Sequence, residues 1–347
     1  MQPIINLIFQ IGIIELFAIF FALANVFTFL LYVIDKRKAV KNRWRISEKV
    51  LIFFTLALGG IGAVLGMRVA RHKTKSMKFR VFGAIGLIIA LIPITHIAHS
   101  FTLDRIIRYV EIEFRSERWN PELNGYRIAF MTDMHTISDE DMRTVAEELS
   151  TRNIDLLLLG GDFAAAIFDR YHFEGTVREI SQTDTTDGIF GVYGNHDTRR
   201  LLFAAKERYG ITPLDNDGVR IQDGFYLAGV SDLWTGIPNV AEAIAGASAD
   251  DFVLLLSHNP DIAMRESTIG IDLMFSGHTH DGQITFFGFP MYLLRGTITR
   301  YGTRFAYGFA YSADGVPVFT SRGIGPYYGI PRIMSRPEVV IFTMYAE

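Results

Sequence analysis

The chain has 347 residues and no cysteine, and its mean hydropathy of +0.22 is high for a protein with 20% charged residues. The absence of cysteine excludes disulfide bonds, thiolate metal sites and cysteine nucleophiles. Residues 1–100 hold 13 Lys+Arg against 3 Asp+Glu, a net charge of +10, whereas the rest of the chain holds 21 against 34, a net charge of −13. The composition therefore predicts two dissimilar parts, and the second is long enough to bury a core of its own.

Three apolar stretches dominate the first part, at residues 11–34, 50–70 and 80–98. Each has about the 20 residues that a helix needs to cross the hydrocarbon core of a bilayer. Residues 1–10 contain no basic residue, which argues against a cleaved signal peptide, so we expect the N-terminus to be retained. Residues 1–100 are therefore predicted to form a helical, multi-pass domain in the cell membrane.

Two basic segments decide the expected topology of this domain. Seven Lys+Arg lie between Lys36 and Lys49 and six between Arg68 and Arg80, and both segments favour the cytoplasmic side. The apolar stretch between them has two alternatives: a straight spanning helix, or a helix broken at its glycines that dips into the membrane and returns. The straight helix, with the first basic segment in the cytoplasm, would place the large domain in the cytoplasm. The broken form keeps both basic segments in the cytoplasm, and on this basis we expect the large domain to be extracytoplasmic.

Four segments within residues 25–92 carry a resemblance, namely LLYVIDKRKA, WRISE, LGGIGAVLGM and RHKTKSMKF. Through them the first part resembles a small family of uncharacterised bacterial integral-membrane proteins. The resemblance implies embedding in a membrane and indicates no activity.

After residue 100, short apolar segments alternate with amphipathic ones, which is typical of an α/β fold. Strands are predicted at residues 110–114, 126–131, 154–159, 188–193, 225–230, 252–257 and 271–276. Helices are predicted at residues 138–152, 198–208 and 238–246. Ser138 or Asp139 is the expected N-cap of the first helix. The Gly- and aromatic-rich residues 283–345 are expected to add further strands and loops.

Five of the predicted strands are followed by Asp, His or Asn, at the sheet edge where open α/β sheets commonly place their sites. Seven of these side chains are candidate metal ligands: Asp133, His135, Asp162, Asn195, His258, His278 and His280. Seven oxygen and nitrogen donors are too many for one tetrahedral ion and suit two divalent ions, with Asp162 as the bridging carboxylate. In extended backbone, alternation would point Asp133 and His135 to one side and turn Met134 away.

The chemistry of these donors indicates both the metals and the substrate. Imidazole, carboxylate and amide ligands without sulfur favour Mn, Fe or Zn over Ca or Cu(I), and do not choose among the three. Two divalent ions with two carboxylates leave a positive site that attracts a phosphate group. The net charge of −13 on this part of the chain disfavours nucleic acid as a partner. We therefore predict a phosphate-containing substrate other than nucleic acid.

The motifs Asp-x-His, Gly-Asp, Gly-Asn-His-Asp, a lone His and Gly-His-x-His occur in this order between residues 110 and 345. By these motifs the second part resembles the calcineurin-like metallophosphoesterases. The resemblance implies a four-layer α/β/β/α sandwich at residues 101–347, preceded by the helical membrane domain at residues 1–100. It implies two metal sites, one formed by Asp133, His135, Asp162 and His280 and the other by Asp162, Asn195, His258 and His278. It also implies that His196 contacts the phosphate and helps to protonate the leaving oxygen, with Asp197 as its orienter.

The segments SHNPD, GHTHDGQI, SRGIG and RPEVVIF look closer still to a membrane-associated branch of bacterial phosphodiesterases. Some relatives in that branch cleave the pyrophosphate of UDP-diacylglucosamine, a lipid precursor. Asp281 departs from the branch, which more often has Gly at this position. We expect Asp281 to be a solvated loop residue, because Asp is common in turns.

The sequence thus predicts a membrane-anchored dinuclear-metal phosphohydrolase that cleaves a phosphoester or pyrophosphate by attack of metal-bound hydroxide on phosphorus. The alternative is a non-catalytic metal-binding membrane scaffold or transporter, against which the complete ligand set and His196 argue. Because the second part begins directly after the third apolar stretch, its substrate is expected at the membrane surface, and a lipid-linked substrate is one option. The aromatic segments 286–294 and 325–330 would then line an entry for acyl chains, although ordinary packing explains them equally well.

Overall fold

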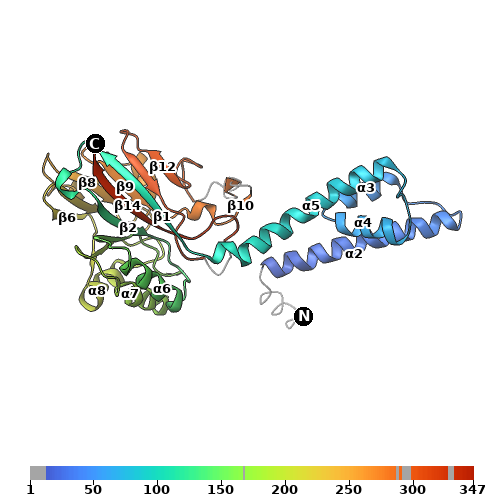
Figure 1. The fold of residues 1–347 in the computed structure, drawn as a ribbon, viewed down its shortest axis with the longest axis horizontal. Helices are drawn as coiled ribbons and strands as arrows, with labels where there is room; N and C mark the ends of the chain where they lie inside the picture. Colours follow the sequence, from blue (N-terminus) through green and yellow to red (C-terminus); the bar gives the residue numbers. More distant parts are fainter. Residues whose placement is uncertain (1–12, 167–168, 287–288, 291–297, 327–331) are drawn as a thin grey trace. The chain divides into compact units, whose positions relative to one another are not determined.

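A computed structural model of the chain describes residues 13–166, 169–286, 289–290, 298–326 and 332–347 (Figure 1). The chain divides into two compact units, Met1–Ala98 and His99–Glu347. The described part of the first unit consists of four helices: α2 (Ile13–Val40), α3 (Glu48–Leu56), α4 (Gly60–Val69) and α5 (Met77–Phe101), whose last residues belong to the second unit.

Two helices are long and apolar enough to cross a membrane, over Leu16–Val40 and Met77–Arg105. Large apolar side chains such as Phe20, Leu23 and Ile88 are more than half exposed on them, which suits contact with lipid. In the second apolar stretch, residues 50–70, the alternative of one straight helix is wrong, because α3 and α4 have only 9 and 10 residues.

The break between α3 and α4 turns the middle stretch into a helical hairpin. In α3, Thr55 Oγ1 lies 2.8 Å from Tyr32 Oη of α2. After α3, the carbonyl of Leu58 accepts a hydrogen bond from Asn25 Nδ2 at 3.0 Å. In α4, the backbone N–H of Gly62 donates to Asn25 Oδ1 at 2.9 Å. A Cβ at Gly62 would lie 1.9 Å from the carbonyl oxygen of Asn25, so only glycine allows α4 to approach α2 this closely.

Both ends of the hairpin meet at the buried carboxylate of Asp35 in α2. Its Oδ2 accepts a hydrogen bond from Arg45 at 3.1 Å and lies 2.7 Å from Nε2 of His72, and its Oδ1 accepts one from the backbone N–H of Ile46 at 2.9 Å. The segments before α3 and after α4 therefore lie at the same end of the first unit. Of the two sequence alternatives, the structure has the broken helix that returns.

Two six-stranded sheets form the centre of the second unit, in the orders β1-β14-β2-β3-β4-β5 and β12-β13-β9-β8-β7-β6. The strands of the first sheet are β1 (Arg108–Ser116), β2 (Tyr126–Met131), β3 (Leu156–Leu159), β4 (Ile189–Gly191), β5 (Ile211–Pro213) and β14 (Glu338–Ala346). Those of the second are β6 (Asp217–Gln222), β7 (Phe225–Gly229), β8 (Phe252–Leu256), β9 (Leu273–Ser276), β12 (Gly308–Tyr311) and β13 (Pro317–Thr320). A separate pair consists of β10 (Thr285–Phe286) and β11 (Phe289–Pro290).

The helices of this unit are α6 (Asp139–Ser150), α7 (Arg170–Ile180), α8 (Arg199–Tyr209) and α9 (Val240–Ala243), with 3₁₀ turns η1 (Leu103–Arg105), η2 (Pro121–Leu123), η3 (Pro260–Met264) and η4 (His280–Gly282). Helices α6, α7 and α8 gather along one side of the first sheet (Figure 1). The Oγ of Ser138 accepts a hydrogen bond from the N–H of Asp141, which confirms Ser138 as the N-cap of α6. The sequence predicted α6, α8 and α9 and missed α7.

Alternating side chains divide the core into layers. In β2, Ile128 and Phe130 belong to the apolar core between the sheets, whereas Ala129 and Met131 belong to the core under the helices. A third apolar cluster covers the other face of the second sheet and includes Val240 of α9. The α/β fold with two stacked sheets, preceded by a helical region, is confirmed.

Candidate metal centre

The side chains predicted to bind metal come from two sheets. The parallel strands β2, β3 and β4 belong to the first sheet, and the parallel strands β8 and β9 belong to the second. The prediction that all five strands end at one edge of a single sheet is therefore wrong. Because the two sheets stack on a common core, their carboxyl ends meet and form the site between them.

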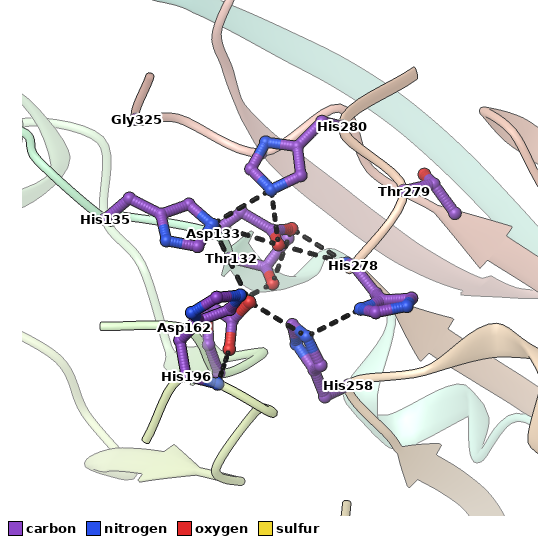
Figure 2. A network of polar contacts seen from close by, with 12 residues as sticks. Thr132, Asp133, His135, Asp162, His196, His258, His278, Thr279, His280 and Gly325 are labelled. Atoms are coloured by element: carbon purple, nitrogen blue, oxygen red, sulfur yellow. Dashed lines mark hydrogen bonds and ion pairs between the residues drawn. The ribbon is translucent and has the colours of Figure 1, made fainter. Parts of the chain in front are cut away.

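Six of the seven predicted ligands form two buried groups (Figure 2). The members are Asp133, His135 and His280 in the first group and Asp162, His258 and His278 in the second. Within each group the candidate ligand atoms all lie within 4.8 Å of one another. The seventh residue, Asn195, lies beside the second group, with its Oδ1 3.2 Å from His258 Nε2.

Asp162 contacts both groups through one oxygen. Its Oδ2 lies 3.2 Å from Nε2 of His258 and 3.6 Å from Nε2 of His135. Its other oxygen accepts a hydrogen bond from the backbone N–H of His196 at 2.8 Å. This carboxylate therefore has the position that a bridging ligand between two cations requires.

The remaining ring nitrogens of three histidines face backbone carbonyls. The Nδ1 of His135 lies 3.1 Å from the carbonyl of Ala164, and the Nδ1 of His258 lies 2.8 Å from that of Gly160. The Nε2 of His278 lies 3.1 Å from the carbonyl of Ile298. A ring nitrogen that donates to a carbonyl leaves the other nitrogen with a lone pair, which is the usual arrangement of a metal-binding histidine. These lone pairs converge with two carboxylates, so the residues fit two divalent cations.

The electrostatics agree with this assignment for His135 and His278, whereas His258 would have to lose a proton to bind a metal ion. Burial and the neighbouring His280 lower the pKa of His135 to about 3, and burial with His258 lowers that of His278 to about 4. Burial disfavours the charge on His258 as well, yet Asp162 raises the pKa of His258 to about 10. Burial also opposes ionisation of Asp162, but His258 holds its pKa below the usual range. Negative carboxylates and neutral imidazoles are the forms that ligate metal ions.

Five of the six clustered residues have positive φ angles. The values are 53° for Asp133, 43° for His135, 57° for Asp162, 71° for His278 and 53° for His280. The expectation of extended backbone at these motifs is therefore wrong. Left-handed backbone is costly for residues other than glycine, and such strain is concentrated at functional sites.

Two glycines allow the loops to pass close to the carboxylates. A Cβ at Gly194 would lie 2.2 Å from Oδ1 of Asp162, and a Cβ at Gly277 would lie 2.5 Å from Oδ2 of Asp133. A side chain at either position would displace the carboxylate, so the glycines are needed for ligand geometry.

His196 and Asp197 lie next to the clusters but differ in their contacts. The His196 ring is partly exposed, and its centroid lies 5.3 Å from that of His135. The carboxylate of Asp197 is buried and accepts hydrogen bonds from the backbone N–H groups of Asp162, Phe163 and Gly194 at 2.7, 2.9 and 2.9 Å. These contacts make Asp197 a positioning residue for two loops, and its expected role as the orienter of His196 stays a prediction.

Sequence reasoning missed Asp232 and Trp234. The fully buried Asp232 follows β7, and its Oδ2 accepts hydrogen bonds from the N–H groups of Trp234 and Thr235 at 2.9 and 2.8 Å. This holds Trp234 beside the second group, with its ring centroid 4.4 Å from that of His278. An acidic residue after a sixth strand was the available signal for Asp232.

The expectation that Asp281 is solvated is wrong. Asp281 is only 8% exposed, and its Oδ2 lies 2.9 Å from Nε of Arg322. Burial raises the pKa of Asp281, while Arg322 opposes the rise. This ion pair joins the turn after His280 to the segment that leads to β14.

Comparison with known proteins finds two matching family models. Residues 126–282 match the calcineurin-like phosphoesterase model, and residues 25–79 match a model of a protein of unknown function, DUF1294.

Relatives with similar sequences are found in bacteria and in fish. The uncharacterized metallophosphoesterase YkuE of Bacillus subtilis is 28% identical over 64% of this chain and 79% of its own length. A transmembrane protein with metallophosphoesterase domain of Danio rerio is 25% identical over 84% of this chain and 69% of its own. The phosphodiesterase YaeI of Escherichia coli is 29% identical over 63% of this chain and 82% of its own.

Proposed function

Since the chain belongs through residues 126–282 to the calcineurin-like phosphoesterases, a family of metal-dependent hydrolases, we propose that it is a membrane-anchored hydrolase of a phosphodiester or pyrophosphate. In this proposal residues 1–100 are the membrane domain and residues 101–347 the catalytic domain. The contact of Asp162 with both groups of histidines is the observation that carries the proposal.

We assign one metal ion to the first group and a second ion to the second group. The proposed ligands are Asp133, His135, Asp162 and His280 for one ion, and Asp162, Asn195, His258 and His278 for the other. Two divalent cations held there would neutralise the charge of a bound phosphate group and lower the pKa of a coordinated water. The donors do not distinguish Mn, Fe and Zn.

The residues of the chain have separate tasks around this centre. The His196 ring is partly exposed beside His135, where it reaches a bound phosphate group and can give a proton to the leaving oxygen. Asp197 keeps Asp162 and Gly194 in register by binding both of their backbone N–H groups.

A substrate with an apolar group is supported by the surroundings of the second group. Trp234 is 53% exposed next to His278, and Ile237 in the same loop is 84% exposed. The two apolar helices and the transmembrane relative indicate association with a membrane. We propose on these grounds that the substrate is lipid-linked. The aromatic segments 286–294 and 325–330 lie largely outside the described residues.

The topology of the first unit supports an extracytoplasmic catalytic domain. The hairpin places both basic segments at the same end of this unit, and basic segments favour the cytoplasm. One further span through α5 would then lead the chain to the opposite side of the membrane.

The test of the proposed reaction is hydrolysis of a chromogenic phosphodiester by detergent-purified protein, stripped with a chelator and resupplied with Mn, Fe or Zn. We expect Asp162→Asn and His278→Ala to lose more than the roughly 10–100-fold that loss of an outer-shell group costs. His172→Ala is the matched control, because His172 lies outside both groups with its side chain 40% exposed. Full turnover in the two ligand variants would overturn the proposal.

A further inference from the structure

A cavity of about 420 Å³ lies in the second unit. Its lining includes the polar residues Ser100, Asp104, Arg105, Thr136, Asp141 and Arg332. Among the residues that the structure describes, none of the proposed metal ligands lines this cavity. The cavity is therefore distinct from the site proposed to hydrolyse the substrate.

Three residues of the lining each have one buried polar atom without a hydrogen-bond partner in the part of the chain that the structure describes. The atoms are Oγ of Ser100, Oδ1 of Asp104 and Nη1 of Arg332. The three residues are 1%, 4% and 3% exposed. A buried polar atom without a partner is unfavourable, so three of them on residues that line one cavity indicate a polar occupant.

The other polar atoms of Asp104 and Arg332 hold these side chains in place. The Oδ2 of Asp104 accepts a hydrogen bond from the N–H of Met334 at 2.8 Å and lies 2.8 Å from Nδ1 of His99. The Nε and Nη2 of Arg332 donate to the carbonyl of Gly325 at 3.0 and 2.7 Å. The free atoms are thus presented by fixed groups, which lowers the entropic cost of binding a ligand.

The charged residues of the lining indicate which chemical groups a ligand of the cavity carries. Arg105 and Arg332 are balanced by Asp104 and Asp141, so the lining suits neither a simple anion nor a simple cation. A phosphate oxygen would accept from Nη1 of Arg332, and a hydroxyl or ammonium group would donate to Oδ1 of Asp104. A phosphoester that carries a hydrogen-bond donor satisfies both.

The position of the lining in the chain indicates where this ligand comes from. Ser100, Asp104 and Arg105 are among the last residues of Met77–Arg105, one of the two candidate membrane spans. The end of a span lies at the level of the lipid head groups. We propose that the cavity binds the head group of a phospholipid whose phosphate carries an ethanolamine or glycerol group.

The proposed lipid would act on the metal centre through Arg332. The Nη2 of Arg332 lies 3.4 Å from Nδ1 of His280, whose other nitrogen faces Asp133 at 3.2 Å. A head group bound to Nη1 therefore restrains a side chain that contacts a proposed metal ligand. This head-group site is separate from the proposed hydrolysis. Binding to it can be measured without turnover, so the two proposals can be tested independently.

The experiment measures binding of head-group probes to the full-length, metal-loaded protein by calorimetry. The probes are phosphoethanolamine, glycerol 3-phosphate and phosphocholine, and the last is the matched control because its choline group has no hydrogen-bond donor. The same three head groups are then offered as diacyl lipids in nanodiscs. Tighter binding of the lipids than of the soluble probes identifies a membrane source, whereas tighter binding of the soluble probes overturns it.

The variants separate the cavity from the metal centre. We expect Arg332→Gln and Arg105→Gln to weaken binding of the ethanolamine and glycerol probes roughly tenfold or more. The first variant loses a charge-assisted hydrogen bond to the phosphate, and the second loses a positive charge of the lining. Arg105 is exposed, so its variant tests the cavity even if Arg332→Gln disturbs folding. Arg265→Gln, at an exposed position outside the lining, should bind normally, and Asp162→Asn should still bind the probes although it loses turnover. Equal binding of the choline probe, or loss of binding in Asp162→Asn, would overturn the proposal.

Discussion

The Nε2 atoms of His135 and His280 lie 2.9 Å apart, although their residues are far apart in the sequence. The Nδ1 of His135 faces the carbonyl of Ala164, so its Nε2 presents a lone pair toward His280. The carboxylate of Asp133 faces the same point, with its Oδ1 3.2 Å from Nε2 of His280. Lone pairs that meet in a buried place repel one another unless a cation or proton lies among them.

Removal of metal should therefore destabilise the catalytic domain. A ligand present at about 100 times its dissociation constant adds about 2.7 kcal/mol to the free energy of unfolding. For a domain of this size, we expect chelation to lower Tm by roughly 5–10 °C. Differential scanning fluorimetry of the detergent-purified protein measures this shift, and the His172→Ala variant should show the same shift as the unchanged chain. An unchanged Tm after complete metal removal would contradict the expectation.

The glycine at position 194 should be needed for metal binding rather than for folding alone. In Gly194→Ala the new methyl group would meet Oδ1 of Asp162 at 2.2 Å and move the proposed bridging carboxylate. We expect at least about a tenfold loss of metal affinity, comparable to the loss of an outer-shell group. The measurement is a metal titration followed by calorimetry.

Gly315→Ala is the control for this substitution. Gly315 has a φ of 85°, so alanine there is strained, but its Cβ would meet no atom within 4 Å. We expect a loss of stability of about 1 kcal/mol with normal metal affinity. Equal effects of the two variants on metal affinity would show that backbone strain, and not contact with Asp162, is responsible.

Substitution of Trp234 should affect substrates according to their apolar groups. The ring lies beside His278 and is half exposed, so an acyl chain or other apolar group of a bound substrate can cover it. We expect Trp234→Ala to raise KM for a lipid-linked phosphodiester roughly tenfold, since burying an aromatic side chain contributes about 1.5–3 kcal/mol. The kcat should change little, and Trp234→Phe should recover most of the loss. A similar rise in KM for a small water-soluble phosphodiester would refute a role in recognising apolar groups.

The hairpin of the first unit predicts which loops share a side of the membrane. The chain has no cysteine, so single cysteines can be labelled selectively with a membrane-impermeant maleimide. Trp44→Cys and Thr74→Cys, before and after the hairpin, should react from the same side of oriented vesicles. Glu117→Cys, on the surface of the catalytic domain, should react from the other side. Labelling of positions 44 and 74 from opposite sides would require a fully spanning middle helix.

The local segments of the catalytic domain were predictable because their patterns are local. The run YRIAFM alone predicts β2, and the structure begins and ends that strand at the same residues. Ser138 before three acidic residues predicts the start of α6, because a side-chain cap and the helix dipole act within one turn. The motif residues were identifiable for a related reason, since Asp, His and Asn directly after buried strands are rarely accidental.

The division of the strands between two sheets was not predictable from those patterns. Strand β14 pairs between β1 and β2, although more than 200 residues separate it from either one in the sequence. Pairing of this kind depends on which apolar faces cover each other, and apolar runs do not encode it. The burial of Asp281 has the same cause, because its partner Arg322 follows β13 and is 41 residues away in the sequence.

What the amino-acid sequence determined by itself is the order of the elements, the two dissimilar parts and the residue types that meet at the metal centre. Its motifs named Asp133, His135, Asp162, Asn195, His258, His278 and His280, six of which the structure gathers into two buried groups. Only the tertiary structure decided the left-handed backbone of these residues, the return of the hairpin to Asp35 and the position of Arg332 beside the cavity. The physical reason is that conformations which are locally unfavourable persist only where distant packing supports them.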